Sequence, residues 1–255
     1  MKLKNHHIYL IFISLSIISI ILNYIFKYEF MNILANISYS IFAATLMAIF
    51  IDFYNQKREE EEKNRFKEIL FKDINNQLSI LIGNLLWFEE HMNEDWINWN
   101  LDIEYFLNIK FRIDMLQYND EYEISFDEAM RRLEELSNKY KLEKMEKMDE
   151  EELCKIIKMF NILSIQCTQV VLRLSQLENN KILLDNGDYI KIEEFDQIFH
   201  DMNFCRILMS KKKKNYGLAI NLLMSSTSKI RKISNYENNI KISITEGYFN
   251  IENIL

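Results

Sequence analysis

The chain has no proline, and only four glycines and three cysteines occur among its 255 residues. Proline and glycine supply most tight turns, bulges and phosphate-binding loops, so their scarcity excludes a glycine-rich nucleotide loop and favours long helices. Cys154, Cys167 and Cys205 are odd in number and far apart, and they contain no C-x-x-C pair. This pattern argues against a disulfide framework or a zinc site and indicates reduced, cytosolic thiols.

Catalytic motifs are also absent from the sequence. There is no nucleophile elbow and no H-E-x-x-H pair. Only His91 and His200 lie outside the N-terminal segment, and neither follows an arginine at the four-to-six-residue spacing of the Arg-x4-6-His motif found in helical ribonuclease domains. We therefore expect no enzymatic activity.

One group of residues has metal-ligand spacing. Glu193, Asp196 and His200 share one face of a predicted helix, and a second helix would have to complete the site. The conceivable donors there are Glu89, Glu90 and His91. Because carboxylates on exposed helix faces are common, we expect neither a metal nor a cofactor.

Two long uncharged runs occupy the N-terminal part of the chain. Residues 8–26 are nineteen consecutive uncharged positions and residues 30–51 are twenty-two, each enough to cross about 30 Å of hydrocarbon. A cleaved signal peptide is the alternative for the first run, but its apolar part exceeds the usual length of about 7 to 15 residues. We predict a transmembrane hairpin over residues 1–53 and a cytoplasmic helical domain over residues 54–255.

The flanking charges predict the orientation of this hairpin. Two lysines precede the first run, four basic residues follow the second, and the short connection holds only Lys27 with Glu29. By the positive-inside rule, we expect a multi-pass protein of the inner (cytoplasmic) membrane with both termini in the cytoplasm.

Each predicted span carries a row of small and polar residues, which let membrane helices approach closely and form hydrogen bonds. These rows are Asn36, Ser40, Ala44 and Ala48 in the second span and Ser16, Ser19 and Asn23 in the first. Two interpretations remain open: packing within one hairpin, or contact between copies in a homo-oligomer with a polar-lined path. Neither span contains a charged side chain, which argues against a pump or proton relay.

Two apolar seams with heptad spacing follow the spans. The first consists of Phe71, Ile74, Leu78, Leu81, Leu85, Phe88 and Met92, and the second of Leu153, Ile156, Phe160, Leu163, Cys167, Val170, Leu174 and Leu177. Ser125 with Glu128 and Asp149 with Glu152 have the spacing of capping boxes at helix starts. The predicted fold class is all-α: the hairpin followed by an antiparallel helical bundle with coiled-coil-like seams.

Three segments allow more than one interpretation. The aromatic residues of 93–123 either plug the end of the bundle, which we favour, or form a ligand platform; they are Trp96, Trp99, Tyr105, Phe106 and Phe111. Asn186-Gly187 is typical of a β-hairpin, but helices predicted on both sides favour a helix-to-helix loop. Residues 240–244 alternate as in a short strand or form a frayed end.

Charge is unevenly distributed. Residues 73–109 contain seven acids and no lysine or arginine, and residues 202–236 contain eight basic residues and no acid. Either the two stretches are neighbours in the bundle, or the basic one forms a surface for anionic lipid or a small anionic ligand. That candidate surface consists of Arg206, Lys211, Lys212, Lys213, Lys214, Lys229, Arg231 and Lys232. Four consecutive lysines spread around a helix, so nucleic acid is not an expected partner.

In architecture, residues 8–26, residues 30–51 and the helical remainder resemble small two-helix membrane effectors of bacterial anti-phage defence systems. The resemblance implies growth arrest or death through loss of membrane integrity after infection. We expect an oligomeric membrane effector or sensor whose bundle receives a signal and whose hairpins assemble in or perturb the membrane. The alternative is a non-enzymatic, membrane-anchored adaptor or scaffold that recruits a cytoplasmic protein partner.

Overall fold

The computed structural model describes residues 6–26, 29–100, 122–179, 189–210, 215–234 and 239–242, and these residues are mostly helical. The chain divides into two compact units, Met1–Phe66 and Lys67–Leu255. The division falls later than the predicted boundary after residue 53, because the charged continuation of the second apolar helix belongs to the first unit.

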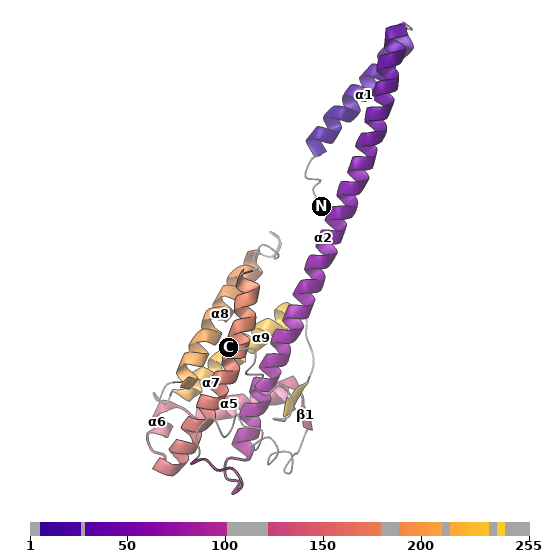
Figure 1. Cartoon of the computed structure of the whole chain (residues 1–255). Coiled ribbons are helices and arrows are strands. Elements are labelled where there is room, and N and C mark those ends of the chain that lie inside the picture. The colour runs from indigo at the N-terminus through magenta and orange to yellow at the C-terminus, as the bar shows by residue number, and fades with distance from the viewer. Residues whose placement is uncertain are drawn as a thin grey trace. The chain divides into compact units, whose positions relative to one another are not determined.

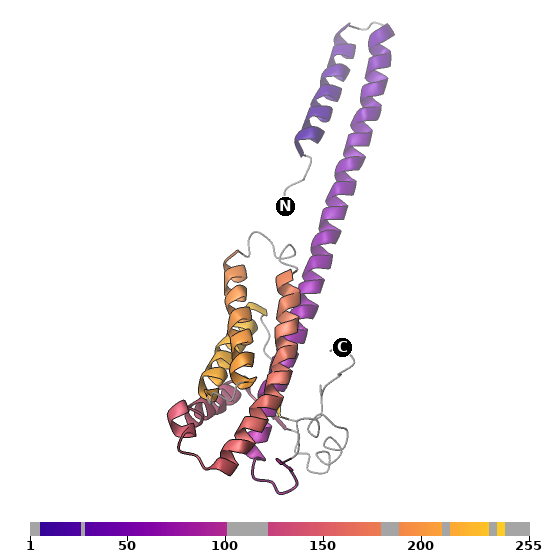
Figure 2. The same cartoon turned by 60° about the vertical axis from the view of Figure 1, so that its left-hand side comes forward.

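Unit 1 consists of α1 (His6–Phe26) and the first part of α2 (Glu29–Glu90). The two helices run side by side in opposite directions (Figures 1 and 2). Both contain a segment long and apolar enough to cross a membrane. The charged residues after the second apolar run continue α2 without a break, as their composition predicts, since no proline or glycine interrupts them.

Unit 2 is a helical bundle that includes the last part of α2. Its other helices are α5 (Phe126–Lys139), α6 (Leu142–Met145), α7 (Glu150–Asn179), α8 (Tyr189–Ser210) and α9 (Tyr216–Ser234). α7 packs on α8, α8 on α9, and α9 on α5; Figure 2 shows α7 and α8 side by side. The residues of both predicted seams are buried in one core, apart from Phe71 and Leu153, which are half-buried. The prediction of a mostly helical fold is confirmed for the described residues.

Both predicted capping boxes begin helices. The Glu128 amide donates to Ser125 Oγ at 3.2 Å at the start of α5, and the Glu152 amide donates to Asp149 Oδ1 at 2.8 Å at the start of α7. Each side chain satisfies an amide that has no partner within its own helix.

A short two-stranded sheet supplements the helices. β1 (Tyr122–Ile124) pairs antiparallel with β2 (Ile240–Ile242), with Tyr122 opposite Ile242. The alternating tail therefore contains a strand, as one of the two interpretations predicted. Its partner strand lies more than a hundred residues earlier in the chain, and the sequence did not predict it.

The two described glycines allow close backbone approach. A Cβ at Gly83 of α2 would lie 2.0 Å from the carbonyl oxygen of Lys241 in β2, and a Cβ at Gly217 of α9 would lie 2.5 Å from that of Ser137 in α5. The Gly217 amide also donates to the Tyr140 carbonyl at 3.0 Å. Glycine is thus used here for packing between elements.

Several predictions fall outside the described residues. These are the predictions for Tyr105, Phe106, Phe111, Asn186-Gly187 and Lys211–Lys214.

Candidate functional site

The helices of unit 1 meet along faces that match the predicted row on α1 but differ from it on α2. On α1, Ser16 is buried and Ser19 and Asn23 are half-buried. On α2 the buried positions are Ala35, Ser38 and Thr45, whereas Asn36, Ser40 and Ala44 are exposed and Ala48 is half-buried. Packing within one hairpin is therefore the wrong interpretation for Asn36, Ser40 and Ala44. Contacts along a helix alternate spacings of three and four, and a row at a strict spacing of four turns by about 40° per step.

Polar groups inside this helix pair are unequally satisfied. The Ser38 and Thr45 hydroxyls donate to backbone carbonyls one turn earlier, at 2.9 and 2.7 Å. Ser19 Oγ and Asn23 Oδ1 are buried without a hydrogen-bond partner among the described residues.

A polar contact closes the open end of the helix pair. The Tyr9 hydroxyl, near the start of α1, donates to the Asp52 carboxylate, which follows the second apolar run. This bond joins the two helices at the end opposite their connection.

The acidic stretch of α2 is neutralised in part by α5 and α7. Asp73 pairs with Arg173 at 2.7 Å, and Glu89 and Glu90 pair with Lys139 and Arg132 at 2.5 Å each. The two stretches are neighbours at one point, since the Asn75 side-chain amide donates to Ser234 Oγ at 2.8 Å. The ion-pair partners, however, come from outside residues 202–236, so the expected charge complement between the two stretches is not seen among the described residues. The reason is that arginines and a lysine of α5 and α7 lie against α2 and neutralise its acidic residues.

Two tyrosines complete this network. The Tyr140 hydroxyl donates to Glu89, and the Tyr122 hydroxyl donates to Glu90 at 2.5 Å. Burial, followed by the neighbouring carboxylate, raises the pKa of both phenols. They remain neutral donors at physiological pH.

The described residues of the basic stretch do not form one exposed surface. Arg231 is buried, with its guanidinium carbon 4.1 Å from the ring centre of Phe126, so its assignment to an anion-binding surface is wrong. The cause is the packing of α9 on α5, whose first residue is Phe126. The other described members are Lys229, which pairs with Asp201 at 3.6 Å, Arg206, which binds Asn203, and Lys232, which is exposed.

Cys167 and Cys205 are buried between helices. Cys167 occupies its seam position as a small buried side chain, as predicted. A hydrogen bond with Cys167 and burial raise the pKa of the Cys205 thiol. Both features disfavour a nucleophilic thiolate.

The residues with metal-ligand spacing are not brought together in the described part of the chain, where no group of three or more such side chains could hold a metal. Glu89 and Glu90 form the ion pairs above. His91 stacks on Trp87 with ring centres 4.3 Å apart, and His200 is exposed on α8.

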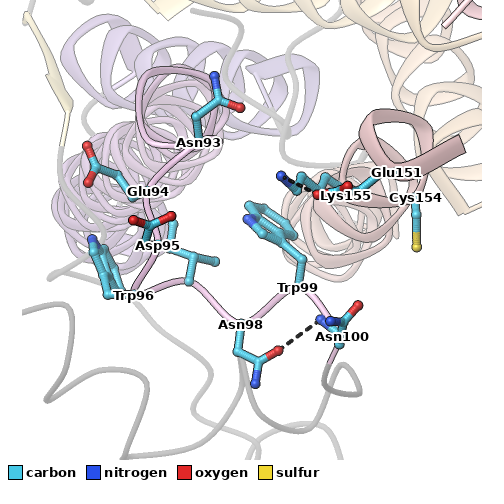
Figure 3. Close-up of a pocket in the computed structure, with 11 residues that line it drawn as sticks. Asn93, Glu94, Asp95, Trp96, Asn98, Trp99, Asn100, Glu151, Cys154 and Lys155 are labelled. Carbon is cyan, nitrogen blue, oxygen red and sulfur yellow. Dashed lines mark hydrogen bonds and ion pairs between the residues drawn. The ribbon is translucent and has the colours of Figure 1, made fainter. Parts of the chain in front are cut away.

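A cavity of about 760 Å³ lies between the residues that follow α2 and the first turns of α7 (Figure 3). The loop contributes Asn93 to Asn100, and α7 contributes Glu151, Cys154 and Lys155. Of the two interpretations of the aromatic residues of 93–123, the less favoured one, a ligand platform, corresponds to this pocket, because Trp96 and Trp99 line it. The other candidate ligand surface, in the basic stretch, lies elsewhere in the chain.

The tryptophans of the pocket are anchored in the core. Trp99 is buried with its ring centre 5.9 Å from that of Phe88, and Trp96 is half-buried with its ring centre 5.8 Å from that of Trp87. Lys158 of α7 also donates to the Trp99 carbonyl. These contacts agree with the predicted aromatic plug and fix one wall of the pocket.

No protein-family model, curated protein or solved structure matches this chain.

Proposed function

We propose that this protein is an oligomeric effector or sensor anchored in the inner membrane, with both termini in the cytoplasm. Unit 2 receives a signal through a ligand or a protein partner. The hairpins of unit 1 respond by assembling in the membrane or perturbing it. By the architectural resemblance, the setting is anti-phage defence.

The observation that carries this proposal is the continuity of α2. One 62-residue helix supplies both the second apolar segment and a core element of unit 2. Ile74, Leu78 and Leu81 of this helix are fully buried, so α2 cannot shift without repacking the core. Its single glycine, Gly83, is held against β2. A change in the bundle therefore reaches the apolar segment through the helix itself.

The exposed polar side chains of α2 support assembly. Asn36 and Ser40 lie exposed on the other face of α2. In hydrocarbon the Asn36 side-chain amide has no water to bind, and an unpaired polar group costs several kcal/mol there, on the order of 2 to 7. Contact between copies would supply a partner for this amide.

Growth and membrane potential during induced expression in a bacterial host test this proposal. We compare the full chain with a shortened chain that begins at Tyr54. The Ala44→Leu/Ala48→Leu variant adds bulk to the row, and Ile37→Leu/Ile41→Leu is its matched control on exposed positions of the same helix. We expect the full chain and the Ile37/Ile41 control to be toxic and to depolarise the membrane. The shortened chain should have neither effect, and the Ala44/Ala48 variant should show both effects more weakly.

Two results would contradict the proposal. Equal toxicity of the shortened chain would remove the role of unit 1. A full chain that is harmless under every condition, including phage challenge, would favour the adaptor or scaffold, and capture of a protein partner would then be the next experiment.

A further inference from the structure

We propose that the pocket between residues 93–100 and α7 binds a small organic cation that carries several ammonium groups. The role of this ligand as the signal rests on the proposed function, whereas its binding can be measured independently.

Unpaired negative charge is concentrated at this pocket. Three acids of the acidic stretch, Asp73, Glu89 and Glu90, form ion pairs with residues of α5 and α7. Glu94 and Asp95 are exposed and form no ion pair with any described residue. Glu151 pairs with Lys155 at 3.2 Å. Three carboxylates and the Lys155 ammonium line the pocket, and with Lys158, which donates to the Trp99 carbonyl, the formal charge there is −1.

The helix ends at the pocket add to this negative potential. α2 ends at Glu90 and has no basic residue in its last turn, so its partial negative charge has no cation of its own helix beside it. α7 begins at the other wall, and its partial positive charge is already matched by Glu150, Glu151 and Glu152. A cation is therefore the ligand that this environment favours.

Aromatic rings make the pocket suitable for an organic cation. Trp96 is half-buried and lines the cavity, and its ring is held against Trp87. A tryptophan face attracts an ammonium group within about 6 Å of its centre, whereas a strongly hydrated inorganic ion keeps its water. A volume of about 760 Å³ lies within the range of small-molecule sites.

The pocket is also connected to α2. Trp87 and Phe88, whose rings contact Trp96 and Trp99, belong to the last turn of that helix. A ligand against the pocket tryptophans therefore acts on the helix that supplies the second apolar segment.

Intrinsic fluorescence of the full chain in detergent micelles measures this binding. All three tryptophans of the protein, Trp87, Trp96 and Trp99, lie at or beside the pocket. Spermidine is the probe, in amine-free buffer at fixed ionic strength, because salt screens exposed charges. We expect a saturable fluorescence change, and about tenfold weaker binding in Glu94→Gln/Asp95→Asn because two partly exposed ion contacts are lost.

Matched controls separate specific binding from counterion attraction. Glu134→Gln/Glu143→Gln removes two exposed acids outside the lining and should leave the affinity unchanged. MgCl₂ at equal charge concentration should displace spermidine weakly. Equal loss in both double variants, equal displacement by Mg²⁺ or no saturable change would each overturn the proposal. Binding without membrane depolarisation would reject the proposed membrane function alone, and depolarisation without binding would reject the pocket alone.

Discussion

Replacing Gly83 with alanine should destabilise unit 2, although the same substitution stabilises an exposed helix by about 0.5 to 1 kcal/mol. The new Cβ would lie 2.0 Å from the Lys241 carbonyl oxygen and 3.1 Å from its carbonyl carbon. These are backbone atoms, so no side-chain rotation relieves the overlap. Overpacking of this kind costs about 1 to 3 kcal/mol. A 2.0 Å approach to backbone is a severe overlap, so the cost lies near 3 kcal/mol, and after the helix gain is subtracted we expect a net loss of about 2 kcal/mol.

Urea unfolding of the full chain in micelles, followed by tryptophan fluorescence, measures this loss. Amide hydrogen exchange at Lys241 and Ile242 then shows whether the ladder between β1 and β2 has opened, because both residues belong to it. Lys72→Ala changes an exposed position of the same helix and should alter stability by less than about 0.5 kcal/mol.

An unchanged or higher stability of the Gly83 variant, with unaltered exchange at Lys241, would refute the reasoning. It would mean that the backbone of β2 does not approach α2 at this glycine.

Two further substitutions test the core. Burial raises the pKa of Tyr216 to about 12 from 10.0, and its hydroxyl has no hydrogen-bond partner among the described residues. The stability due to the neutral phenol is complete below pH 10 and is lost as the pH rises through 12. Tyr216→Phe keeps the ring stack on Phe160, so we expect about 1 kcal/mol more stability at pH 7 and a smaller loss between pH 10 and 12 in pH-dependent urea unfolding. Leu163→Asp should cost on the order of 3 to 5 kcal/mol, and Leu172→Asp, at an exposed position of the same helix, less than about 0.5, by thermal or urea unfolding.

Local signals in the sequence predicted much of the fold. The caps at Ser125 and Asp149 depend on residues three positions apart, and the two seams depend on periodic spacing along one helix. Such patterns fix where a helix begins and which side becomes apolar. They predicted the helix starts and almost all of the buried seam residues correctly.

Pairings between distant elements could not be predicted in this way. The partner of β2 is β1, and nothing in the alternation of Ile240 and Ile242 specifies it. Arg231 is buried because α9 meets α5 at Phe126, and Glu89 pairs with Lys139 because α5 reaches the end of α2. The net charge of a stretch predicts the sign of its electrostatic potential, but it does not specify which helix will supply the neutralising charges. For the same reason the ligand platform at residues 93–123 stayed one of two open interpretations.

The face of α2 that meets another copy can be distinguished from the face that meets α1 with two serines. Ser38 and Ser40 lie two positions apart and so point about 200° away from each other; Ser38 is buried and Ser40 is exposed. Cys154→Ser removes the one exposed native cysteine, since the other two are buried. In this background, oxidation of membranes with copper phenanthroline should link Ser40→Cys chains into dimers and leave Ser38→Cys chains monomeric. Equal dimerisation of both would show that α1 does not cover Ser38. Monomers in both cases would contradict assembly through the row at Asn36, Ser40 and Ala44, because a close contact between copies brings matching positions within reach of a disulfide.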